Sequence, residues 1–407
     1  MYHDRLRLHR MLWFTYKQLS IVILLILCSV HLFKSTALGY STSIAIDAVS
    51  FLFMMSICIF KPTQATYKGA FYTYPVFLFC VGIGLSIVTT YMTRGQGPFH
   101  TFVAYHSYYF ILLYFVFRNY LPSLKNVEIA ICILGILYIC LHFMQYVLYP
   151  NELFITKFIE DRGSLRFKIE GGALLSVFHL FSLNKYMVNK RLIYLFMYIL
   201  SLVVILMQGY RTLLLAYLIC ALLMSILITK FNGKSLLRII TVLVSLFIVV
   251  ATSAFLLNIL NEMAKSTEYD FGIGSINIRL EALRFYFGSY MREWYYFVIG
   301  GGMPNSESKY GDYIWKCNEM GLYWEDIGFL GFYCVNGLVV SAGYLWIMIR
   351  SVRLKCRKEF LYAKFFMIYL LLCSLTTMEM FRNGVFGVVA LSMYILERSN
   401  LGCDDGR

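Results

Sequence analysis

Apolar stretches long enough to cross a membrane recur along the whole of this 407-residue sequence. A helix needs about 20 mostly apolar residues to span the hydrocarbon core of a bilayer, and this length constrains the fold more than any motif. The stretches lie near residues 19–33, 39–60, 71–92, 99–117, 127–149, 171–188, 192–209, 211–229, 236–258, 327–349, 362–378 and 383–397. They predict an all-α integral membrane protein, a polytopic bundle of about 12 (11–12) transmembrane helices.

Composition excludes the other broad classes of protein. Hydrophobic residues make up 60% of the chain and charged residues only 14%, whereas soluble domains average about 45–50% and 25%. So little polar surface cannot coat a water-soluble multidomain enzyme, and a disordered or collagen-like chain is excluded as well. Because no repeat, low-complexity tract or flexible linker interrupts the pattern, residues 1–407 are predicted to form a single membrane domain.

The distribution of positive charge predicts which connections face the cytoplasm. If the N-terminus is cytoplasmic, 22 of the 36 Lys and Arg residues fall in cytoplasmic segments and the C-terminus is cytoplasmic too. This follows the rule that cytoplasmic loops collect Lys and Arg. Ten of the remaining cations lie in two longer external loops, a smaller one at 150–170 and a large one at 259–326. Topology therefore accounts for most of the net charge of +14, and no nucleic-acid partner is expected.

Cofactor and metal motifs are missing from the sequence. The eleven Cys form no CxxC pair, and most fall in apolar stretches, so neither a disulfide framework nor a cysteine zinc site is expected. Walker A, GxGxxG and HExxH motifs are also absent. Asp47 is a polar residue within a span, but it lies only eight residues after Gly39, and partial solvation accounts for it. We expect no cofactor and no metal.

The smaller external loop, 150–170, gathers charge immediately before a span. Arg162, Arg166 and Lys168 lie among three carboxylates. A solvated, salt-bridged loop is one interpretation, because exposed charge clusters commonly have no other role. An anion-binding cradle at the outer membrane surface is the other, and the loop alone does not separate them.

Arg211 occupies a tight turn between two spans, in the sequence Gln208-Gly209-Tyr210-Arg211. An arginine at the interface is often only a snorkelling anchor. This turn is on the cation-poor side, however, which makes an anchor less natural. A cation beside the free N–H groups at a helix start is well placed to hold phosphate.

An apolar stripe with helical spacing runs through the large loop, and Arg279, Arg284 and Arg292 stand beside or opposite it. One interpretation is an amphipathic helix lying on the membrane. The other adds that these arginines face a lipid-linked anionic substrate. The loop ends with Glu325 and Asp326 at the mouth of the next span, where they either mark the interface or deprotonate a sugar hydroxyl.

Four of these features, in their order along the chain, resemble the bacterial O-antigen polymerase and ligase superfamily. The ordered series covers roughly residues 160–350, and the first 150 residues are similar only as generic spans. The features are the loop arginine Arg166, the turn 210–215 (YRTLLL), the segment 277–282 (NIRLEA) leading to 299–302 (IGGG), and the span entry 326–332 (DIGFLGF).

The resemblance implies a helical bundle of the bacterial inner membrane with one large periplasmic loop. It also implies transfer of a glycan from undecaprenyl diphosphate to an acceptor hydroxyl at the periplasmic face, without nucleotide or metal. Arginines suit a leaving group that gains charge in a partly dry site. The resemblance assigns catalytic roles to Arg166, Arg211 and Arg279 and, as a weaker assignment, an acceptor base to Glu325 or Asp326; Arg162, Lys168, Arg284 and Arg292 would assist in substrate binding.

Three functions compete within this interpretation. Ligases of the superfamily, which transfer the finished chain to the lipid A core, resemble one another in having a histidine in the large loop. The seven histidines here are residues 3, 9, 31, 100, 106, 142 and 179, all outside 259–326, which favours a repeat-unit polymerase of O-antigen or capsule. A flippase of lipid-linked oligosaccharide would need polar groups lining its bundle, and these spans are nearly uncharged. A polymerase would bind membrane lipid, undecaprenyl-diphosphate-linked oligosaccharide and, by family resemblance, a chain-length regulator.

Overall fold

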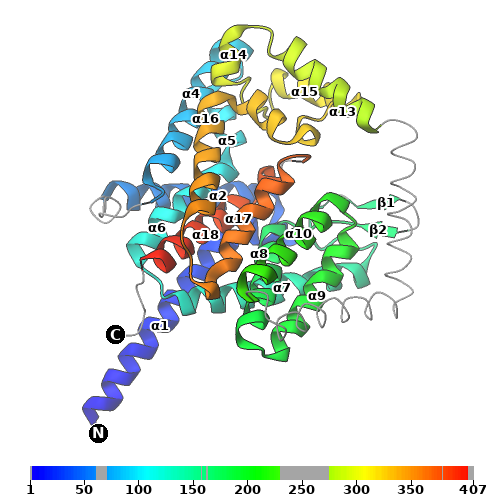
Figure 1. Cartoon of the computed structure of the whole chain (residues 1–407). Coiled ribbons are helices and arrows are strands. Elements are labelled where there is room, and N and C mark those ends of the chain that lie inside the picture. The colour runs from blue at the N-terminus through cyan, green and yellow to red at the C-terminus, as the bar shows by residue number, and fades with distance from the viewer. Residues whose placement is uncertain are drawn as a thin grey trace.

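A computed structural model of the chain describes residues 2–60, 71–156, 158–161, 164–229, 275–377 and 379–401. Within these ranges the chain is helical apart from one two-stranded antiparallel hairpin, β1 (Ile159–Asp161) and β2 (Ser164–Arg166). The all-helical expectation is therefore confirmed at the level of fold class. Figure 1 shows the helices bundled side by side, with the hairpin at one edge.

The helices begin and end close to the expected apolar stretches. Those of the first half are α1 (Tyr2–Ser29), η1 (His31–Lys34), η2 (Thr36–Leu38), α2 (Gly39–Phe60), α4 (Thr73–Arg94), α5 (Pro98–Ala104), η3 (His106–Leu112), α6 (Leu113–Tyr120) and α7 (Leu124–Leu148). Those of the second half are α8 (Gly172–Asn189), α9 (Leu192–Gln208), α10 (Arg211–Thr229), α13 (Ser275–Arg284), the π-helix η4 (Phe285–Tyr290), α14 (Trp294–Ile299), α15 (Lys309–Glu319), η5 (Trp324–Ile327), α16 (Gly328–Arg353), η6 (Lys358–Phe360), α17 (Leu361–Cys373), η7 (Glu379–Phe381) and α18 (Val385–Asn400).

In the described part of the chain, five helices are long and apolar enough to cross a membrane, which makes this a helical membrane protein. They are Thr42–Phe60, Thr73–Arg94, Leu124–Leu148, Arg211–Ile228 and Trp324–Arg353. The span expected at 99–117 is not one continuous helix, because the chain passes from α5 into the 3-10 turns of η3 before α6 begins. The span expected at 236–258 lies outside the described residues.

The centre of the bundle is packed tightly around α8 and α18, whose side chains are buried along nearly their whole length. α4 and α16 pack closely against each other. A Cβ added at Gly82 would lie 2.7 Å from Cγ2 of Val340, and one added at Gly343 would lie 2.8 Å from the backbone N of Phe79. Glycine at both contacts lets the two backbones approach, as small residues do between membrane helices.

Several connections meet at the end of the bundle that carries β1 and β2, which we call the hairpin end. The backbone N–H of Thr36, in the α1–α2 connection, donates to the carbonyl of Leu153 at 2.9 Å. The side chain of Gln96, in the α4–α5 connection, accepts from the backbone N–H of Asn305 at 3.0 Å. Turns from four different parts of the sequence therefore share this end.

Other connections meet where α18 ends, which we call the tail end. Lys185, near the last turn of α8, pairs with Glu128 at 2.6 Å. Lys358 donates to the carbonyl of Ile228 at 2.9 Å, and Arg118 lies 3.4 Å from the carboxylate of Glu397. Because α8 runs from the hairpin end to the tail end, these two groups of connections lie at opposite ends of the bundle.

The described part of the large loop forms a helical cap on the hairpin end. Arg94, in the last turn of α4, lies between aromatic rings of this cap: its Cζ is 4.5 Å from the ring centroid of Tyr290 and 4.4 Å from that of Tyr296. Its guanidinium also donates to the carbonyl of Tyr290 at 2.8 Å. Figure 1 shows α14 beside the upper end of α4, with α15 and α13 extending to one side of α4 and α16.

Candidate anion-binding site

Two cations lie near the ring of Tyr210 at the hairpin end. The Nζ of Lys168 is 5.5 Å from the centre of this ring, and the Cζ of Arg382 is 4.9 Å from it. Cations are attracted to the face of an aromatic ring within about 6 Å. The turn before α10, the loop before α8 and the turn before α18 are thereby brought together, although they are far apart in the sequence.

Arg166 is held beside the turn that carries Arg211. Gly209 ends α9 with a φ of +71°, a left-handed conformation that glycine adopts without strain. A Cβ at this position would lie 2.3 Å from Cδ of Arg166, so the arginine stem occupies the space that any other side chain would need. At the sequence Gly209-Tyr210-Arg211, the stem of Arg166 therefore packs beside the turn that carries the Tyr210 ring and begins α10.

Glu379 holds the two cations that lie near Tyr210. Its buried carboxylate bonds to Lys168 and forms an ion pair with Arg382, whose Nε lies 2.9 Å from Oε2. Burial alone would raise the pKa of Glu379, but Arg382 and Lys168 hold it below the ordinary value. Burial and the neighbouring Arg382 lower the pKa of Lys168 to about 8, although Glu379 acts in the opposite direction. Two cations share one carboxylate here, which leaves the group electropositive.

A cavity of about 240 Å3 opens beside this group. Its charged lining is Lys168, Arg382 and Glu170, and its floor is the backbone at Gly171 and Gly172, where α8 begins. The free N–H groups at a helix start favour an anion, and positive side chains beside them add to this preference. The arrangement can therefore bind a phosphate-sized anion.

The structure brings some of the expected site residues together. Arg166, Lys168 and Arg211 converge on the turn at Tyr210, as shown above. Arg162 lies outside the described residues. The sequence did not point to Arg382, which we would have assigned only to a local ion pair with Glu379. That ion pair is present, but the partnership with Lys168 makes Arg382 part of the cation group.

The remaining expected residues form a second group within the cap. Arg279 lies on α13, which packs chiefly against η4 and η5, and its charge acts on the carboxylate of Asp326 in η5. Glu325, beside Asp326, is largely buried, and its Oε2 has no hydrogen-bond partner among the described residues. The side chains of Arg284 and Arg292 are exposed. Among the described residues, the contacts of this second group are with the cap and not with the cations around Tyr210.

Comparison with known proteins does not assign the chain to a family. No protein-family model matches the sequence, and no curated protein matches it. The fold and the site define a helical membrane protein with a cation-lined cavity at the hairpin end.

Proposed function

We propose that this protein is a polysaccharide polymerase of the bacterial inner membrane. It transfers a glycan from undecaprenyl diphosphate to a hydroxyl of another lipid-linked repeat unit, with both chain termini cytoplasmic and the hairpin end periplasmic. The observation that carries the proposal is that Lys168 and Arg382 line one cavity and lie near the ring of Tyr210. The stem of Arg166 packs beside the same turn at Gly209, and Arg211 begins α10 there. A diphosphate has the charge and shape that such a group of cations recognises.

The grouping of the connections supports this orientation. The contacts unite the α1–α2 connection, the 150–170 loop and the turn before α18 at one end, and these are segments that the charge distribution assigns to the outside. The lysine- and arginine-rich connections meet at the tail end. Twelve spans, including one at 236–258, complete the proposed topology.

The chemistry follows from where charge develops. The acceptor oxygen attacks the anomeric carbon of the donor glycan, the bond from that carbon to the phosphate oxygen breaks, and undecaprenyl diphosphate leaves with the added negative charge. Fixed cations lower the barrier because they are already oriented toward that charge. Arg166, Lys168, Arg211 and Arg382 take this role in the proposal.

The cap supplies the acceptor side in the proposal. Glu325 or Asp326 takes the proton of the attacking hydroxyl, and Arg279 orients the carboxylate of Asp326. A buried carboxylate with an unused oxygen, as in Glu325, has an acceptor free for such a proton. Arg284 and Arg292 contact the anionic lipid-linked substrate from the exposed face of the cap.

Deleting the gene and separating the surface glycan by gel electrophoresis tests the proposal. We expect the chain-length ladder to collapse to one repeat unit and to return when the wild-type gene is supplied. A ligase would instead leave long chains on undecaprenyl diphosphate, and a flippase would leave single units inside the cell. An unchanged ladder would overturn the proposal.

A further inference from the structure

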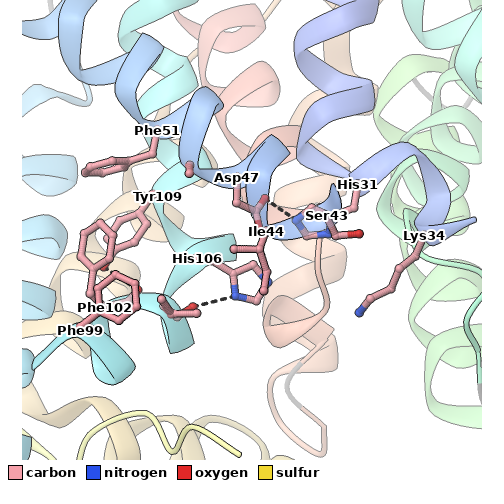
Figure 2. Close-up of a pocket in the computed structure, with 12 residues that line it drawn as sticks. His31, Lys34, Ser43, Ile44, Asp47, Phe51, Phe99, Phe102, His106 and Tyr109 are labelled. Carbon is pink, nitrogen blue, oxygen red and sulfur yellow. Dashed lines mark hydrogen bonds and ion pairs between the residues drawn. The ribbon is translucent and has the colours of Figure 1, made fainter. Parts of the chain in front are cut away.

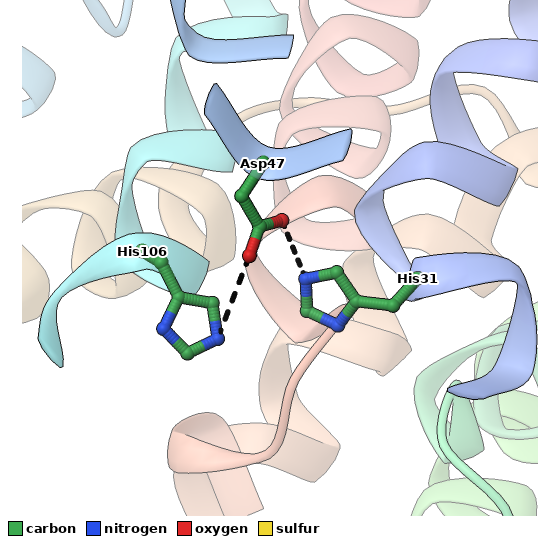
Figure 3. Close-up of side chains that lie close together, drawn as sticks. All are labelled: His31, Asp47 and His106. Carbon is green, nitrogen blue, oxygen red and sulfur yellow. Dashed lines mark hydrogen bonds and ion pairs between the residues drawn. The ribbon is translucent and has the colours of Figure 1, made fainter. Parts of the chain in front are cut away.

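A second cluster of polar side chains lies apart from the cations around Tyr210. Asp47 of α2 lies between two imidazoles: its Oδ1 is 2.6 Å from Nε2 of His31, and its Oδ2 is 3.9 Å from Nε2 of His106 (Figure 3). The three residues come from η1, α2 and η3. One ligand atom from each lies within 4.8 Å of the other two.

The far nitrogen of each imidazole is already engaged. Nδ1 of His106 lies 3.0 Å from the carbonyl of Val103, and a carbonyl only accepts, so this nitrogen carries a proton. Nδ1 of His31 bonds the carboxylate of Glu170, which is also 3.4 Å from Nζ of Lys34. Histidines that bind metals are oriented in this way, with Nδ1 donating to a carboxylate or carbonyl and Nε2 left for the metal.

Both Nε2 atoms therefore face the same carboxylate. When both Nδ1 atoms carry the ring proton, two Nε2 lone pairs meet a carboxylate, and a cation among the three ligand atoms, either a proton or a metal ion, offsets their repulsion. We propose that His31, Asp47 and His106 bind a zinc ion. Two imidazoles and one carboxylate suit zinc, whereas magnesium and calcium prefer ligand sets made only of oxygen.

The distances leave room for this ion. Zinc bonds of about 2.0–2.2 Å place neighbouring ligand atoms roughly 3–3.5 Å apart. The two separations from Asp47, 2.6 Å and 3.9 Å, lie on either side of that range. All three ligand atoms lie within 4.8 Å of one another, so side-chain rotations of about an ångström would bring them to the spacing of a zinc site.

A cavity of about 230 Å3 borders the cluster and gives the ion a fourth, open coordination position. Figure 2 shows His31, Asp47 and His106 on one side of this cavity and aromatic side chains, among them Phe51 and Tyr109, on the other. Three protein ligands and one open position are typical of zinc sites that hold a water or a ligand. The ion also ties η1, α2 and η3 together. This inference does not depend on the proposed transfer reaction.

Metal titration of the full chain tests the site. The detergent-purified protein, with any affinity tag removed and metals stripped by chelator, is titrated with zinc chloride by calorimetry. It is then titrated with cobalt chloride and followed by visible absorption. We expect one ion per chain and the intense visible bands of four-coordinate cobalt. A wild-type protein that binds no zinc would overturn the proposal.

Variants locate the ion. His106→Ala and Asp47→Asn should each weaken zinc binding at least 100-fold, and Glu170→Gln about 10–100-fold through His31. His100→Ala, which changes another histidine of the same region, should bind as the wild type does. If His106→Ala or Asp47→Asn fails to fold, the zinc affinity of Glu170→Gln decides whether these residues bind the ion. Wild-type affinity in all the folded variants would show that only a proton joins these residues, and would overturn the proposal.

Discussion

Lys168 and Glu379 form a buried ion pair that joins the loop before α8 to the turn before α18. Glu379 also pairs with Arg382, so one carboxylate positions two cations near the ring of Tyr210. The ion pairs among Lys168, Glu379 and Arg382 explain how a mostly apolar chain keeps a buried lysine at its hairpin end. They also make Glu379 a positioning residue for the proposed substrate site.

Replacing Glu379 with Gln should destabilise the protein. The substitution leaves Lys168 buried without its counter-ion, and loss of one partner of a buried pair costs about 3–5 kcal/mol. Unfolding of the detergent-solubilised protein, followed by tryptophan fluorescence, measures the change. Glu319→Gln, at the exposed end of α15, is the control and should change the free energy of unfolding by less than about 0.5 kcal/mol. Equal stability of the two variants would contradict the role given to Glu379.

Replacing Gly209 with Ala should abolish polymer formation by displacing Arg166. The new Cβ would lie 2.3 Å from Cδ of that arginine. Gly95→Ala is a matched control, because Gly95 has a similar φ of +66° and nothing within 4 Å of an added Cβ. Both variants carry the same backbone strain, and the chain-length ladder should be lost only in Gly209→Ala. A wild-type ladder from Gly209→Ala would show that the placement of Arg166 is irrelevant.

Arg211→Ala and Arg279→Ala should each reduce polymerisation strongly. Loss of Arg211 removes a preorganised cation that stabilises developing charge, which costs about 10²–10³-fold in rate. Loss of Arg279 leaves the carboxylate of Asp326 without the cation that orients it. Arg191→Ala, an exposed cation at the tail end, is the control and should leave the ladder unchanged. The comparison requires equal amounts of inserted protein, measured by immunoblot of the membrane fraction. Wild-type ladders from both site variants would remove these arginines from the site.

Polymerisation should fall as pH rises through about 8. Lys168 has a pKa lowered to about 8, so its positive charge is present below that pH and is lost above it. Lys168→Arg should remove this step, because arginine stays protonated throughout. Initial rates in proteoliposomes between pH 6 and pH 9.5 measure the profile (roughly the range that brackets the lysine). A falling limb near pH 8 that persists in Lys168→Arg would exclude Lys168 as its cause.

The sequence predicts the helices well, because spans are set by local apolar length. It predicts less well where a span is interrupted. The stretch 99–117 is apolar throughout, yet α5 ends at Ala104 and η3 follows. Bonds between neighbouring segments favour this break: the side chain of Gln96 donates to Thr101, and the ring of His106 reaches Asp47. Such contacts depend on tertiary structure and leave no periodic pattern in the sequence.

The candidate anion-binding site is likewise predicted only in part from the sequence. Arg166, Lys168 and Arg211 stand out in the sequence because cations are scarce on the external side. For Arg382 the sequence predicts only a local pair with Glu379, three residues before it, since nothing in the sequence brings Lys168 next to residue 379. The triad of His31, Asp47 and His106 was also missed, because its members are separated by spacings that match no metal motif. The sequence feature that could have indicated Arg382 is its position in a short external turn, where cations are scarce.

The proposed reaction needs only this protein and its lipid-linked repeat units, with no second enzyme. The most direct measurement uses the purified chain in proteoliposomes, supplied with the lipid-linked single units that accumulate in the deletion strain. We expect glycans of increasing length with stoichiometric release of undecaprenyl diphosphate, and no products with Arg211→Ala. Single units that stay unjoined in the presence of correctly inserted wild-type protein would contradict the claim.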